Sequence, residues 1–128
     1  MALRDYVLED GSWDKLKIEE TVLEFFDRSD AVVSRSPTGL KGCRYRQGSG
    51  KHDPHRCPFG VLIGDDEYDS DMEGDTSWFV LRKWFPTIYN SVGSVGRHWM
   101  LRLQMAHDSE YEIEAVRENL HDFFRDVK

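Results

Sequence analysis

The sequence predicts an α+β domain in which a small antiparallel β-hairpin packs against about four helices. Two patterns carry this prediction: apolar residues recur at helical spacing near the N-terminus and through the second half of the chain, and they alternate in the middle. With 128 residues, 39% of them hydrophobic, the chain is expected to form a single domain over residues 1–128.

The first helix is predicted over residues 14–28, with Ser12 or Asp14 as its N-cap. Its apolar residues fall at i, i+4, i+7 and i+8, which places them on one stripe: Ile18, Val22, Phe25 and Phe26. Residues 30–42 follow as a connector, because serine, proline and glycine recur there.

The hairpin is predicted from two short strands, residues 43–46 and residues 57–63, joined by a loop over 47–56 that holds two glycines and a proline. In the second strand, Phe59, Val61 and Ile63 alternate with their neighbours. Pro58 cannot donate a ladder hydrogen bond, so it is expected at a strand start or a sheet edge.

The C-terminal half predicts three further helices. One runs over residues 78–85 and is ended or kinked by Pro86. The next is marked by the stripe Val95, Trp99, Leu103 and Ala106. The last has the clearest helical spacing, at Ile113, Val116, Leu120, Phe123, Phe124 and Val127.

The net charge of −7 is carried by one segment. The acidic segment, residues 64–75, holds seven acidic residues and no basic one, whereas residues 41–58 hold five Lys or Arg and a single acid. One interpretation is a solvated loop that neutralises the basic hairpin. Another is a calcium loop, although the EF-hand spacing is absent. A third is a surface that imitates nucleic-acid phosphates and binds a partner through Asp65, Asp66, Glu67, Asp69, Asp71 and Glu73.

Two thiols and two imidazoles in the predicted hairpin form a candidate zinc set: Cys43, His52, His55 and Cys57. The spacing is poor, because no C-x2-C knuckle is present. The alternative is that both cysteines are small buried apolar groups beneath an exposed loop. No cofactor is therefore expected, with zinc as the alternative.

A thiol nucleophile is a second candidate chemistry, in which Cys57 or Cys43 would act with His107 and Asp108. His107 continues the stripe of Leu103, so a hydrogen-bonded core histidine is the competing interpretation. The chain carries no G-x-S-x-G, no phosphate-binding glycine loop and no H-E-x-x-H motif.

Arginines and aromatics in the hairpin suit nucleic-acid contacts: Arg44, Tyr45, Arg46, Lys51, Arg56 and Phe59. The competing interpretation pairs these arginines with the acidic segment. The overall acidity argues against nucleic acid as the main ligand.

Several motifs together resemble those of a group of small bacteriophage and prophage proteins. They are C-x-Y-R at residues 43–46, C-x-x-G-x-L-I at 57–63, a sequence close to D-E-x-Y at 66–68, E-G at 73–74 and L-Q-x-x-H-D at 103–108. The chain departs from the group by its longer, histidine-bearing loop at residues 51–56. The resemblance implies a phage origin and no specific chemistry.

Small acidic phage proteins without catalytic motifs often bind and block a host protein, and anti-CRISPR proteins are the analogy. We therefore expect a non-enzymatic inhibitor of a host protein, and the expected target is a nucleic-acid-handling defence complex with a basic groove. There are two alternatives: a small Cys/His enzyme or zinc module, and a nucleic-acid binder. No apolar run is long enough to span a membrane and the N-terminus has no apolar leader, so a cytoplasmic location is expected.

Overall fold

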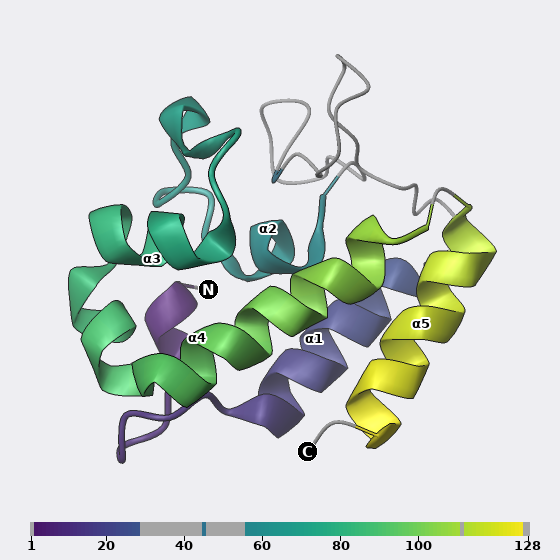
Figure 1. Ribbon diagram of the computed structural model, residues 1–128, viewed down its shortest axis with the longest axis horizontal. Helices are drawn as coiled ribbons and strands as arrows, with labels where there is room; N and C mark the ends of the chain where they lie inside the picture. The colour runs from purple at the N-terminus through teal and green to yellow at the C-terminus, as the bar shows by residue number, and fades with distance from the viewer. Residues whose placement is uncertain (1, 29–44, 46–55, 111, 127–128) are drawn as a thin grey trace.

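Helices make up most of the computed structural model, which describes residues 2–28, 45, 56–110 and 112–126 (Figure 1). Within these residues the predicted α+β fold is wrong, because no sheet is present and the only strand pairing is an isolated bridge between Val7 and Trp13. The described part of the chain contains five α-helices and two 3-10 turns, in the order η1 (Leu3–Tyr6), α1 (Lys15–Phe26), α2 (Pro58–Leu62), η2 (Ser70–Met72), α3 (Ser77–Trp84), α4 (Pro86–Asp108) and α5 (Ile113–Asp126).

The second predicted strand is the short helix α2. Its amides bond four residues back, from Val61 N to the Cys57 carbonyl at 3.0 Å and from Ile63 N to the Phe59 carbonyl at 3.2 Å. The buried apolar residues are Phe59, Leu62 and Ile63, at i, i+3 and i+4, while Val61 is only partly buried. Pro58 starts the helix, where its fixed φ and missing N–H are tolerated.

Of the predicted first strand only Tyr45 lies in the described part of the chain, and it forms a bend. The rest of that strand, the connector over residues 30–42 and the loop over residues 47–55 lie outside the described residues. The structure therefore supports no strand pairing for the described half of the predicted hairpin.

The predicted first helix is confirmed as α1. Asp14 is its N-cap and accepts a hydrogen bond from Lys17 N at 3.1 Å. Its C-terminal end is completed by α5: Arg117 donates from Nε to the Phe26 carbonyl at 2.6 Å and from Nη2 to the Arg28 carbonyl at 2.6 Å. A cation at the carbonyl end of a helix also complements the helix dipole.

Pro86 separates two helices, as predicted, and is also the first residue of α4. Gly93 interrupts α4 with φ 68° and ψ −177°, a conformation that glycine adopts without the cost imposed by a Cβ. In the part of α4 after Gly93, Trp99 and Leu103 are buried as expected. Val95, from the same predicted stripe, is 81% exposed.

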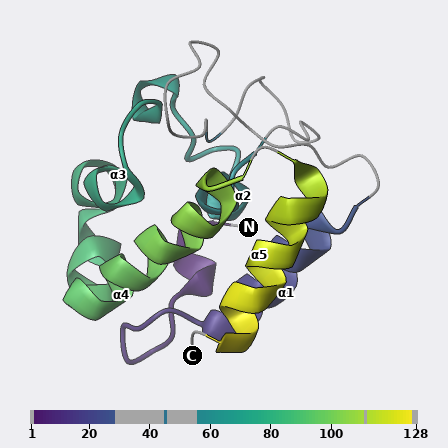
Figure 2. The ribbon, with the colours of Figure 1, turned by 45° about the vertical axis from the view of Figure 1, so that its right-hand side comes forward.

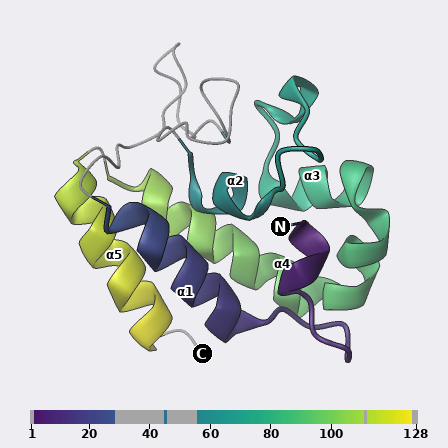
Figure 3. The ribbon, with the colours of Figure 1, turned by 180° about the vertical axis from the view of Figure 1, so that it is seen from behind.

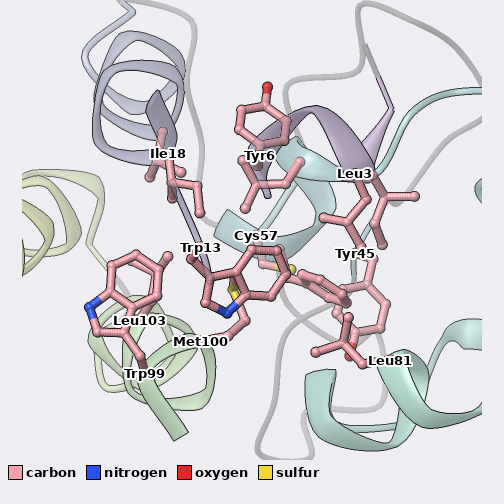
Figure 4. Close-up of a cluster of buried hydrophobic side chains, with 14 of the residues drawn as sticks. Leu3, Tyr6, Trp13, Ile18, Tyr45, Cys57, Leu81, Trp99, Met100 and Leu103 are labelled. Carbon is pink, nitrogen blue, oxygen red and sulfur yellow. The ribbon is translucent and has the colours of Figure 1, made fainter. Parts of the chain in front are cut away.

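The helices share one core. In Figures 2 and 3, α5 lies beside α1 and α4, while α3 packs against α4 and α2 packs against both α1 and α4. Figure 4 shows residues of the N-terminal segment, α1, α3 and α4 gathered with Cys57 in one cluster. Among the described residues, we find no helix with both the length and the apolar character that a membrane span requires.

Candidate functional site

The acidic segment, residues 64–75, connects α2 to α3. In Figures 1 and 3 it stands out from the helices beside α3, with η2 at its tip. Asp69 caps η2 by accepting a hydrogen bond from Asp71 N at 2.8 Å. Met72, inside η2, is fully buried and anchors the segment in the core. The segment is thus a structured projection.

Glu67 ties the start of the acidic segment to the N-terminus of the chain. Its Oε1 accepts from Leu3 N at 2.8 Å and from Gly64 N at 2.9 Å. A carboxylate that accepts two backbone N–H groups makes charge-assisted bonds, which are stronger than neutral ones. The Oε1 atom of Glu67 therefore joins the start of the acidic segment to the N-terminal turn.

Glu73 ties the end of the segment to Tyr45. Its Oε1 accepts from Tyr45 N at 2.9 Å and its Oε2 accepts from the Tyr68 hydroxyl at 2.5 Å. The Tyr45 hydroxyl in turn donates to the Asp75 carbonyl. Tyr45 is 2% exposed, so these bonds link the acidic segment to a buried side chain of the core.

Asp65 contributes to an ion pair with Arg56, with 3.6 Å between Oδ1 and Nη2. The Arg56 side chain is 9% exposed and that of Asp65 is 33% exposed. This contact agrees with the interpretation that basic residues of the predicted hairpin pair with the acidic segment. It applies to one arginine, since Arg44, Arg46 and Lys51 lie outside the described residues.

Asp66 and Asp71 are exposed. Neither side chain forms a hydrogen bond or an ion pair with another described residue, so both carboxylates are accessible to a partner. Of the six predicted partner-binding residues, three are therefore exposed, and one of these, Asp65, pairs with Arg56. Glu67, Asp69 and Glu73 are partly buried and accept hydrogen bonds that hold the segment in place. The sequence pattern did not reveal this division, nor the part played by Tyr45 and Tyr68.

Cys57 is the N-cap of α2, and its side chain is buried at 0% exposure. Gln104 of α4 reaches across to this site: its Nε2 donates to Cys57 Sγ at 3.3 Å and its Oε1 accepts from Phe59 N at 2.7 Å. The amide thus satisfies a buried backbone N–H at the start of α2. The arrangement is typical of a structural core, because the thiol is not open to a substrate.

His107 is also fully buried, one helical turn beyond Gln104. Its Nδ1 lies 2.9 Å from Asp108 Oδ1, and its ring packs against Phe26 with centroids 5.5 Å apart. The competing interpretation of a hydrogen-bonded core histidine describes this environment. Asp108 is the last residue of α4.

The zinc hypothesis falls mostly outside the described residues, because Cys43, His52 and His55 are not among them. Within the described ranges, no group of three or more His, Cys, Asp or Glu side chains is placed to hold a metal ion. The same finding argues against the calcium interpretation of the acidic segment.

Three residues of the predicted basic surface are described, and all are buried: Tyr45, Arg56 and Phe59. They do not form an exposed nucleic-acid surface.

Comparison with protein-family models, curated proteins and solved structures gives no match to this chain.

Proposed function

We propose that this chain is a non-enzymatic, phage-type protein that binds and inhibits a host protein through its acidic segment, residues 64–75. The partner is expected to be a cytoplasmic, nucleic-acid-handling defence protein with a basic groove. One observation carries the proposal: the carboxylates of the segment differ in their roles. Glu67 and Glu73 fix the segment by hydrogen bonds, while Asp66 and Asp71 face solvent.

Preorganisation supports binding by this segment. A loop that is ordered before it meets its partner loses less conformational entropy on association. Here the segment is ordered by hydrogen bonds from Leu3 N to Glu67 and from Tyr45 N to Glu73. Leu3 and Tyr45 are both buried in the core. The exposed carboxylates are therefore presented on a frame that does not have to form during binding.

Electrostatics supports a basic partner. The acidic segment carries seven negative charges, as many as the net charge of the chain. DNA carries about one negative charge per 1.7 Å of its axis, so a groove that binds DNA also attracts a dense row of carboxylates. Such attraction raises association rates and falls as salt is added. The phage-like motifs are the reason to expect a host target, and the burial of Cys57 disfavours the thiol-enzyme alternative.

The test begins with an affinity pull-down from host lysate and identification of the captured protein by mass spectrometry. Binding and inhibition are then measured for Asp66→Asn/Asp71→Asn and for a control, Glu20→Gln/Glu24→Gln, which removes two exposed charges from α1. We expect the first variant to weaken binding about tenfold, mainly through the association rate. The control should behave as the wild type.

Competition identifies the groove. Short duplex DNA should displace the protein from its partner if both occupy the same basic site, and the displacement should be mutual. The proposal fails if Asp66→Asn/Asp71→Asn inhibits the captured partner as well as the wild type does. It also fails if the partner binds duplex DNA and this protein simultaneously without loss of affinity for either.

A further inference from the structure

A second charged region is built from α3 and α4 and has the opposite sign. Residues 76–107 contain no Asp or Glu, and their basic residues are Arg82, Lys83, Arg97 and Arg102 together with two histidines. This stretch covers α3 and nearly all of α4, which pack against each other and occupy the left side and the centre of Figure 1. The negative net charge of the chain therefore conceals a basic region.

Aromatic rings surround one of these arginines. The Arg97 guanidinium lies 3.8 Å from the centroid of the Tyr89 ring and 4.9 Å from that of Trp78. The Trp78 ring makes edge contacts with the rings of Tyr89, at 6.3 Å, and His98, at 4.9 Å. The result is a group of three rings in edge-to-face contact with one guanidinium against two of them, and both helices contribute to it.

The kink in α4 explains how this group forms. Tyr89 precedes Gly93 and Arg97 follows it, and Arg97 Nε donates to the Gly93 carbonyl at 2.9 Å. A Cβ at Gly93 would meet no atom within 4 Å, so the residue is glycine for its positive φ and not for lack of space. Among the described residues, no carboxylate forms an ion pair with Arg97.

The group reaches the surface. His98 and Arg102 are exposed and lie four residues apart on α4, so they share a face. On α3, Arg82 follows Trp78 by four residues and is exposed, and the neighbouring Phe79 is 49% exposed. We call Trp78, Tyr89, Arg97, His98 and Arg102 the aromatic-basic face.

We propose that the aromatic-basic face binds single-stranded nucleic acid. Rings and a guanidinium plane offer stacking surfaces for unpaired bases, and the arginines offer phosphate contacts. An acidic protein would use the cations alone, whereas an unpaired base can also stack on the exposed parts of this group. A duplex would present its phosphates while its bases stayed stacked inside, so it should bind more weakly than a single strand.

This inference goes beyond the proposed function, because it concerns a different surface and a ligand of the opposite charge. The acidic segment ends at Asp75, three residues before Trp78, so its last carboxylates reduce the attraction for phosphate at this end of the face, whereas charges farther away than about 10 Å are screened at 0.1 M salt. The net charge of −7 therefore lowers the affinity for nucleic acid at low salt without removing the local attraction.

The test measures fluorescence anisotropy of labelled oligothymidylate and oligouridylate with the full chain, from about 50 mM to about 200 mM salt. Arg97→Gln should weaken binding and reduce the slope of log affinity against log salt by about 0.7, the value for one phosphate contact on a single strand. Trp78→Ala should weaken binding roughly fivefold or more, with a smaller change in salt slope because it removes stacking. The control is Arg125→Gln, which removes the same charge from an exposed position on α5.

Circular dichroism is recorded for each variant, so that a loss of binding is interpreted only when the helices remain. If Trp78→Ala unfolds, His98→Ala, at an exposed position, replaces it as the variant that removes a ring. The inference is overturned if the wild type does not bind either oligonucleotide at about 50 mM salt, or if Arg97→Gln and Arg125→Gln weaken binding equally. It is also overturned if sedimentation shows a dimer that Arg97→Gln dissociates, since a second copy would then occupy the face. Because the acidic segment is unchanged in these variants, their outcome is independent of the test of the proposed function.

Discussion

Gly60 is the position where the structure predicts the sharpest effect of a single methyl group. A Cβ built on Gly60 would lie 2.1 Å from the Tyr45 carbonyl oxygen, 2.8 Å from its carbonyl carbon and 3.0 Å from its Cα. All three are backbone atoms, so no side chain can rotate out of the way. Gly60→Ala therefore requires α2 and the Tyr45 backbone to separate by more than about 1 Å to restore an ordinary contact.

Two effects of opposite sign set the magnitude. Alanine is favoured over glycine inside a helix by up to about 1 kcal/mol. Overpacking a filled core costs about 1–3 kcal/mol, and displacing Tyr45 also weakens its N–H bond to the Glu73 carboxylate, which contributes about 1.5 kcal/mol or more. We expect a net loss of about 2–3 kcal/mol in the free energy of unfolding, because the two costs together exceed the helix preference.

The assay is thermal unfolding followed by circular dichroism, in which Gly60→Ala should lower Tm by roughly 6–12 °C for a chain of this size. Gly74→Ala is the informative comparison, since a Cβ there meets no atom within 4 Å and only its φ of +87° is strained. That variant should lose about 1 kcal/mol. An unchanged or raised Tm for Gly60→Ala would refute the close contact between α2 and Tyr45.

Three further predictions follow from the core and one turn. Gln104→Leu should lower the free energy of unfolding by about 1–3 kcal/mol in urea titrations, because the buried Phe59 N–H loses its acceptor; equal stability would contradict this role. Leu103→Ala should cost about 2–5 kcal/mol by the same measurement, since the side chain is fully buried, and a cost below that range would place it nearer the surface. The pKa of Asp10 lies below its ordinary value because Ser12 donates to it from its hydroxyl, at 2.6 Å, and from its backbone N–H. This bonding is present at neutral pH and is lost as the pH falls through the lowered pKa, so Ser12→Ala should raise that pKa in an NMR titration, and no change would exclude the bond.

Helices with a long one-sided stripe were predictable from the sequence. In α1 and α5 the period of 3.6 repeats over several turns, and Ile18, Val22, Val116 and Leu120 are all fully buried. The stripe was less informative at its edge: Val95 fits the period of α4 yet is 81% exposed. Periodicity identifies the face of a helix, but it does not show how far the neighbouring elements extend over that face.

The segment that became α2 was not predictable by the same reasoning. Residues 57–63 contain five apolar side chains, so both an alternating set and a helical set can be drawn from them. Gly60 weakens the helical interpretation by its low propensity, although it is the residue that lets Tyr45 approach the helix. The residue that packs against Gly60, Tyr45, lies 15 positions earlier in the chain, so the local pattern of residues 57–63 does not contain this contact.

The same limit applies to the acidic segment and changes how the net charge should be interpreted. Composition located the seven acids, but the acceptor role of Glu67 depends on Leu3, and that of Glu73 depends on Tyr45. Backbone N–H groups donate to these two carboxylates, so their negative charges stabilise the conformation of the segment. Replacing all the acids at once would remove the frame and the exposed charges together. Only separate replacement of the exposed pair and of the frame distinguishes a binding surface from a structural turn.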